Sequence, residues 1–159
     1  MDEILKLLEM DSRMTPTQIA QATGQDETEV RETIRKYETD GTILKYTALI
    51  NEDQLAEQHV TAMIELKISP QQGQGYDRIA QRIYQYNEVE SLYLMTGSYD
   101  LIVTMTARTM KDAAQFVYEH LAAIDGVTAT ATHFVMKKYK EKNCVLAKVP
   151  EQEERLYFV

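Results

Sequence analysis

The chain has 159 residues and a formal net charge of −8. Hydrophobic residues make up 44% and charged residues 26%, a globular composition that excludes a disordered or fibrous chain. No apolar run approaches the roughly 18 residues of a membrane helix, so no membrane partner is expected. The opening residues lack the basic and apolar stretches of a signal peptide, which predicts a cytoplasmic protein. Cys144 is the single cysteine, so neither an intramolecular disulfide nor a cysteine-based metal site is expected within one chain.

Capping signals divide the first part of the chain into three helices. Thr15-Pro16 combines an N-cap residue with a proline suited to the first helical position. Asp26 precedes another apolar stripe and has Glu29 three residues later, a pattern like a capping box. The predicted elements are helices over residues 2–10, 15–24 and 26–40, a strand over residues 43–50 and a linker over residues 51–59.

The remainder of the chain alternates strands and helices. Within residues 60–68, Ala62, Ile64, Leu66 and Ile68 alternate with Met63, Glu65 and Lys67, as in a half-buried strand. The predicted elements are strands over residues 60–68, 89–96, 101–107 and 127–136, helices over residues 76–86 and 110–124, and an edge strand over residues 145–149. The order β-α-β-β-α-β predicts an antiparallel sheet with both helices on one face.

The sequence therefore predicts an α+β protein of two domains. A winged-helix-like helix-turn-helix domain over residues 1–50 precedes a ferredoxin-like domain over residues 60–149, and residues 150–159 form a C-terminal tail. Two helices cover only one face of a sheet, so a second subunit is expected on the other face.

The spacing of Ala20, Gly24 and Val30 indicates a helix-turn-helix that binds double-stranded DNA. A small residue lets the helices approach, glycine turns the chain and an apolar residue anchors the recognition helix. An ordinary three-helix cluster is the alternative. The candidate DNA-binding residues are Thr15, Thr17, Thr28, Glu29, Arg31, Glu32, Arg35 and Lys36.

The charge of the recognition helix opposes this interpretation. Residues 26–46 carry four basic and six acidic side chains, and acidic groups repel phosphate. Glu29 or Glu32 could accept a hydrogen bond from a cytosine amino group. Alternatively, the glutamates only stabilise the helix surface, through pairs such as Glu27–Arg31 and Glu32–Lys36.

A second candidate site lies between two predicted strands, at Gly97, Ser98, Tyr99 and Asp100. Glycine permits a close approach, and a hydroxyl beside a carboxylate suits an amino-acid ammonium group. A plain hairpin turn held by the aspartate is the alternative. Thr130 and Thr132 share one face of the last strand and could supply neutral partners, although threonine is also common in strands for its β-propensity.

No signature of an enzyme stands out. The sequence lacks a nucleophile elbow, a glycine-rich phosphate loop and a paired-carboxylate pattern. His59, His120 and His133 do not have the spacing of metal ligands. We therefore expect no catalytic residues, no metal and no cofactor.

Together these residues resemble the Lrp/AsnC (feast/famine) family of transcriptional regulators over roughly residues 1–149. The segments that carry the resemblance are Ile4–Arg13, Ile19-Ala20 with Gly24, Glu38–Ile43 leading into Lys45–Ala48, Val89-Glu90-Ser91, Met95–Leu101, Ile124–Val127 and Thr130-Ala131-Thr132. The resemblance implies a helix-turn-helix followed by a ferredoxin-like (RAM) domain. It also implies homodimers that pair through strand faces, often an octamer of four dimers, and an amino acid bound between dimers near Gly97–Asp100.

The chain departs from the family pattern in the recognition helix. Family members often have a serine followed by basic residues where this chain has Glu29, Arg31, Glu32 and Thr33. The leading hypothesis is a DNA-binding transcriptional regulator that responds to an amino acid. The alternative is an effector sensor or assembly partner that has lost direct DNA binding.

Overall fold

A computed structural model describes residues 2–69 and 75–146 of the chain. The chain divides into two compact units, Met1–Ile50 and Asn51–Val159, which we treat separately. Among the described residues, no helix has both the length and the apolar character required to cross a membrane.

The first unit contains the three predicted helices, α1 (Glu3–Met10), α2 (Pro16–Thr23) and α3 (Glu27–Thr39). Each helix begins with a side-chain cap, because the first N–H groups of a helix have no partner within it. Asp2 Oδ1 accepts from the Ile4 N–H at 3.0 Å, and Asp26 Oδ1 accepts from the Thr28 N–H at 2.8 Å. The starts of α2 and α3 at Thr15 and Asp26 therefore follow from local sequence, as predicted, whereas the cap by Asp2 was not predicted.

The three helices share one apolar core. Its members come from all three helices and are the buried residues Ile4, Leu8, Ile19, Ala20 and Val30. Ile19 and Val30 are fully buried, which ties α2 to α3 across the turn.

The strand predicted over residues 43–50 does not form. The Ile43 N–H donates to the Tyr37 carbonyl oxygen at 2.8 Å, and the chain then continues without regular structure through Ile50. A strand requires a neighbour for its backbone groups, and no described segment pairs with these residues. The β-branched and aromatic residues that suggested a strand, such as Ile50 and Tyr46, remain exposed.

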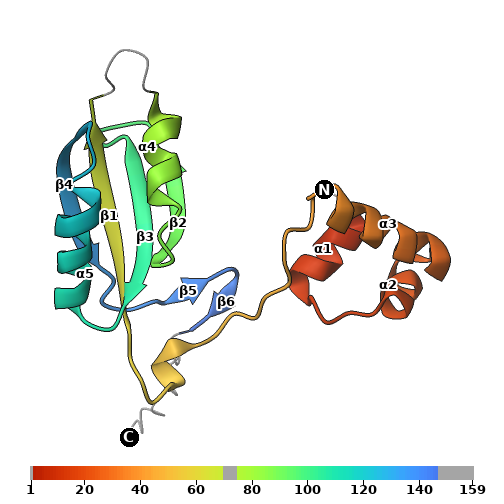
Figure 1. Cartoon of the computed structure of the whole chain (residues 1–159). Helices are drawn as coiled ribbons and strands as arrows, with labels where there is room; N and C mark the ends of the chain where they lie inside the picture. The colour runs from red at the N-terminus through yellow and green to blue at the C-terminus, as the bar shows by residue number, and fades with distance from the viewer. Residues whose placement is uncertain (1, 70–74, 147–159) are drawn as a thin grey trace, which may run out of the picture. The chain divides into compact units, whose positions relative to one another are not determined.

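The second unit is built on a four-stranded antiparallel sheet in the order β2-β3-β1-β4. Its helices α4 and α5 lie on the same face of the sheet (Figure 1). The principal elements are β1 (Val60–Ile68), α4 (Tyr76–Ile83), β2 (Val89–Leu94), β3 (Leu101–Ala107), α5 (Met110–Phe116) and β4 (Val127–Phe134). The predicted β-α-β-β-α-β order is confirmed.

Strand β1 pairs with both β3 and β4, so its side-chain alternation sets the two faces of the sheet. Ala62, Ile64 and Leu66 are fully buried beneath the helices. Side chains at the alternate positions point to the other face, which we call the open face. By register with β1, the open face comprises Thr61, Met63, Glu65 and Lys67 of β1, Ile102, Thr104 and Thr106 of β3, Ser91 and Tyr93 of β2, and Ala129, Ala131 and His133 of β4.

Several element ends differ from the predictions. The helix expected over residues 110–124 becomes a π-helical turn, η2 (Val117–Leu121), where the Ala122 N–H donates to the Val117 carbonyl oxygen at 2.8 Å. The helix expected over residues 76–86 ends at Ile83, and the strands expected to reach residues 96 and 136 end at Leu94 and Phe134.

The last described residues form a separate two-stranded ribbon rather than an edge of the main sheet. Its strands are β5 (Lys140–Glu141) and β6 (Cys144–Val145), joined by two residues with positive φ. The rest of the strand predicted over residues 145–149, and the predicted tail over residues 150–159, lie outside the described residues from position 147 onward.

The start of the predicted linker is attached to the second unit. It forms a short 3-10 helix, η1 (Glu52–Gln54), and Lys138 Nζ lies 3.1 Å from Glu52 Oε2. The residues from Asn51 to Gln54 are therefore fixed by contacts that the polar composition of this segment did not reveal.

We expect Leu121→Ala to destabilise the second unit strongly. Leu121 is 0% exposed in the core between helix and sheet, whereas Tyr118 in the same π-helical turn is 79% exposed. Emptying the buried position should lower the free energy of unfolding by about 2–5 kcal/mol, measured by urea denaturation. Tyr118→Ala is the control and should change it by about 0.5 kcal/mol or less. Equal effects of the two substitutions would contradict this packing.

Candidate DNA-binding and effector sites

The α2–α3 pair has the geometry of a helix-turn-helix. Gly24 ends α2 with a left-handed φ of 70°, a conformation that glycine adopts without strain. Asp26 then caps α3 by accepting from the N–H groups of Thr28 and Glu29. The inward positions Ala20 and Val30 are both buried, as the spacing predicted. These contacts fix the orientation of α3 relative to α2.

The outer surface of α3 carries most of the candidate DNA-binding residues. The exposed members are Thr28, Glu29, Arg31, Glu32, Arg35 and Lys36. Arg31 Nη2 lies 2.6 Å from Glu27 Oε1, so this guanidinium is already paired within the helix. The second predicted pair, Glu32–Lys36, is not among the ion pairs of the described residues. Arg35 and Lys36 are the exposed cations of α3 outside the Glu27–Arg31 pair.

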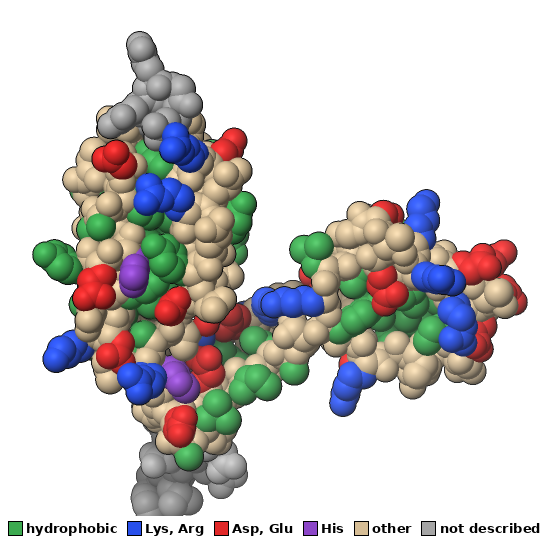
Figure 2. Space-filling view, viewed as in Figure 1, with side chains coloured by type: hydrophobic (Ala, Val, Ile, Leu, Met, Phe, Trp, Pro, Cys, Tyr) green, Lys and Arg blue, Asp and Glu red, His purple; other side chains and the backbone are tan. Residues whose placement is uncertain are grey.

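Acidic and basic side chains are intermixed on the three-helix unit (Figure 2). The visible surface shows no continuous basic stripe of the kind that normally binds a phosphate backbone. On α3 the exposed Arg35 and Lys36 lie among several carboxylates, which weaken the attraction of this helix to phosphate.

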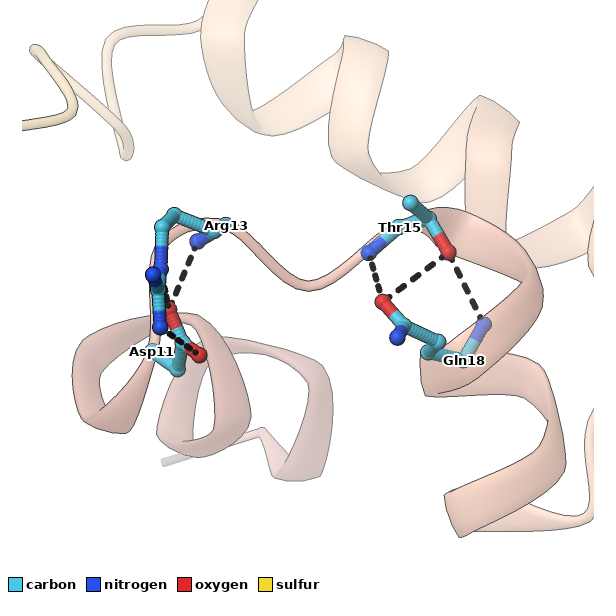
Figure 3. A network of polar contacts seen from close by, with 4 residues as sticks. All are labelled: Asp11, Arg13, Thr15 and Gln18. Atoms are coloured by element: carbon cyan, nitrogen blue, oxygen red, sulfur yellow. Dashed lines mark hydrogen bonds and ion pairs between the residues drawn. The ribbon is translucent and has the colours of Figure 1, made fainter.

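The start of α2 holds the other two candidates, Thr15 and Thr17. Thr15 forms a reciprocal capping box with Gln18, in which the Thr15 N–H donates to Gln18 Oε1 at 2.8 Å and the Gln18 N–H donates to Thr15 Oγ1 at 3.3 Å (Figure 3). Thr15 is therefore committed to the cap, whereas Thr17 is exposed in the first turn of the helix. Arg13 just before it is paired with Asp11 at 3.0 Å, and this pair lowers the pKa of Asp11.

The turn from Gly97 to Asp100 connects β2 and β3. Gly97 has φ 125°, which explains why glycine is required there. Ser98 is exposed, and Tyr99 and Asp100 are half-buried. The turn thus presents a hydroxyl and a carboxylate next to a position without a side chain, as the sequence predicted.

Asp100 also stabilises its own chain. Its Oδ2 accepts from the Ile68 N–H at 2.7 Å and lies 3.4 Å from Lys67 Nζ, while its backbone N–H donates to the Leu66 carbonyl oxygen at 3.0 Å. The hydrogen bond from Ile68, followed by the contact with Lys67, lowers the pKa of Asp100. Because this pKa is lowered on folding, the stabilisation is present above the usual carboxyl value of about 4 and is lost as the pH falls through the lowered value.

Thr130 and Thr132 do not lie beside the Asp100 carboxylate within one chain. They pair with Leu66 and Ile64, and residues paired across a ladder share a face of the sheet. Both threonines therefore belong to the helix-covered face, whereas Lys67, the ion-pair partner of Asp100, belongs to the open face. The sequence could not show this separation because it depends on the register between β1 and β4.

Two groups of functional interest were missed from the sequence. Lys67 places an ammonium beside Asp100, and a second pair on the open face brings His133 Nε2 within 3.4 Å of Glu65 Oε2. Glu65 and His133 line a hollow of about 250 Å³ together with Met63 and Ile102. The alternation of β1 indicated that Glu65 and Lys67 face away from the core, but their partners come from other strands. Among the described residues, no three potential metal ligands come together.

Comparison with known proteins agrees with both halves of this architecture. The model of the Lrp/AsnC ligand binding domain matches residues 61–145. YugG of Bacillus subtilis, an uncharacterised HTH-type transcriptional regulator, is 43% identical over 139 residues, which are 87% of this chain and 84% of YugG.

Two solved structures share the fold. The transcriptional regulator NMB0573 of Neisseria meningitidis, in complex with L-Met, has a TM-score of 0.72 at 22% identity, covering 87% of this chain and 89% of that one. A feast or famine regulatory protein of M. tuberculosis, complexed with L-methionine, has a TM-score of 0.73 at 18% identity, covering 91% and 95%. The chain therefore belongs to the Lrp/AsnC family of transcriptional regulators, and not to a family of enzymes.

Proposed function

We propose that this regulator binds DNA through α3, responds to an amino acid and acts as an assembly of homodimers, up to an octamer of four dimers. The observation that carries the proposal is the combination of a helix-turn-helix with a ligand-binding domain whose sheet has one face without helices. The dimer joins two such units, so that several weak DNA contacts act together.

The open face suits a second copy of the chain. It combines exposed apolar side chains, including Met63 and Tyr93, with groups of both charges. A two-fold interface brings the same surface together from both copies, so a face that carries its own anions and cations can pair with itself. Covering this face also removes the exposed apolar surface from water.

The dimer interface can be tested with a charge placed in it. Met63→Glu puts a carboxylate on the open face next to Glu65, and we expect dimer dissociation to become easier by at least about tenfold in sedimentation equilibrium. Met110→Glu is the matched control, because Met110 is 48% exposed at the start of α5 and Met63 is 42% exposed. A wild-type protein that is monomeric at micromolar concentration, or a Met63→Glu variant with unchanged association, would exclude this interface.

We assign DNA binding to the exposed cations of α3, with the exposed residues Thr15, Thr17, Thr28, Glu29 and Glu32 as further candidate contacts. Arg35 supports this assignment more strongly than Arg31, since Arg31 is paired with Glu27 and has to leave that partner to reach a phosphate. The glutamates that remain exposed are suited to cytosine amino groups in the major groove.

We expect Arg35→Ala to weaken DNA binding and to lower the salt slope by about 1, since one phosphate contact is lost. Arg31→Ala should have a smaller effect. Titration of labelled genomic fragments at several salt concentrations measures both, and Arg108→Gln, whose side chain is 85% exposed in the other unit, is the control. Failure of the wild-type dimer to bind any fragment at low salt would favour the alternative function, an effector sensor that does not bind DNA.

The effector site is proposed at Gly97, Ser98, Tyr99 and Asp100, with Thr130 and Thr132 contributed by a second copy. Support comes from the adjacent charges of Asp100 and Lys67, which match the ammonium and carboxylate of an amino acid. Because the threonines lie on the opposite face from Lys67 in one chain, a site that uses all six residues needs two chains. Two structural relatives are complexes with methionine, which makes methionine the first amino acid to test.

Calorimetry with methionine and the other amino acids tests the site. Asp100→Ala should weaken the effector roughly tenfold or more, since a charge-assisted hydrogen bond is lost. The same substitution should lower the melting temperature, because the Ile68 N–H loses its acceptor. Asp112→Ala, which removes only the pair with Arg108, is the control. A folded Asp100→Ala protein with wild-type affinity would restrict Asp100 to its role in the hairpin.

A further inference from the structure

The Glu65–His133 pair lies on the open face and is formed across two strands. His133 Nε2 of β4 is 3.4 Å from Glu65 Oε2 of β1. The side chain of His133 is 61% exposed and that of Glu65 is 28% exposed, so both now have access to water. Met63 and Ile102 complete the hollow around them. A partner that covers the open face therefore takes a carboxylate and an imidazole out of water together.

The other charged groups on this face already have partners. Lys67 of β1 lies 3.4 Å from Asp100 in the turn just before β3, so this cation and this anion balance each other. On this face β2 contributes Ser91 and Tyr93, and β3 contributes Ile102 and Thr104, which are uncharged side chains. The carboxylate of Glu90, at the register shift of β2, lies near the Lys138 ammonium. Glu65 is thus the carboxylate whose balancing charge depends on His133.

Imidazole groups change charge between about pH 5 and pH 8, within the physiological range. When His133 is neutral, covering the open face buries the Glu65 carboxylate without a cation, which is costly. When His133 is protonated, the same step buries a charge-assisted pair instead. The two protonation states of His133 therefore favour dimer formation to different extents.

We propose that the Glu65–His133 pair makes association through the open face pH-dependent, with a tighter dimer at low pH. The inference rests on the proposed dimer and adds a regulatory input to it. Dimerisation takes up protons because the covered Glu65 carboxylate favours the imidazolium form of His133. By linkage, the extra stability of the dimer is present when His133 is protonated and is lost when His133 is neutral.

Sedimentation equilibrium of the full chain at about pH 6 and about pH 8, at constant ionic strength, tests the proposal. We expect the wild-type dimer dissociation constant to be roughly tenfold lower or more at the acidic pH, since each subunit contributes one charge-assisted contact. His133→Gln should abolish this difference because the titrating group is absent. Glu65→Gln should abolish it independently because the imidazolium no longer has a carboxylate.

His120→Gln is the control, because the His120 ring packs at a tilt against the rings of Tyr86 and Phe116, which belong to the helix side of the sheet. Its pH dependence should equal that of the wild type. A dimer with equal affinity at both pH values, or tighter at the higher pH, overturns this inference and leaves the dimer proposal intact. A wild-type monomer at both pH values overturns both. Retention of the full pH effect in folded His133→Gln or Glu65→Gln protein also overturns the inference.

Discussion

The central position of β1 is the constraint on which the second unit depends. A strand with neighbours on both sides has its backbone groups satisfied, and its side chains must alternate between the two faces of the sheet. Ile64 and Leu66 enter the core under α4 and α5 because of this alternation. The same geometry forces Glu65 and Lys67 onto the open face. The alternation of β1 therefore places apolar side chains in the core on one face and charged side chains on the other.

The ends of β1 and β3 show how a structural contact and a binding group can coincide. Asp100 accepts the Ile68 N–H and pairs with Lys67, so the carboxylate is held in one position before any ligand arrives. A group fixed in this way loses less conformational entropy on binding than a mobile one. The alternative interpretations of Asp100, as a hairpin residue or as an effector ligand, are therefore compatible in physical terms.

In the first unit, the carboxylates that stabilise α3 also oppose DNA binding. Glu27 and Glu29 lie in the first turn of α3, where negative charge stabilises the helix through its interaction with the helix dipole. Glu27 also pairs with Arg31. These same carboxylates reduce attraction to phosphate. An assembly that presents several copies of α3 compensates for weak binding by each, which links the proposed function of the first unit to association of the second.

The sequence by itself determined the features that depend on neighbouring residues. Thr15, Asp26 and Gly24 marked the ends of α2 and α3 because caps and left-handed turns are local. Alternation in β1 and the order of elements were enough to predict the sheet and its helices, because they report burial along one strand or helix at a time.

Tertiary structure alone decided which residues meet. Residues 43–50 had the composition of a strand but found no partner in the described chain, and the helix predicted to reach residue 124 changed to a π-helical turn at Val117. The Glu65–His133 contact joins two strands and the Lys67–Asp100 contact joins β1 to the turn before β3, so both depend on the register of pairing. The register is set when all strands pack one face of the sheet together, so it cannot be predicted from any single segment of the sequence.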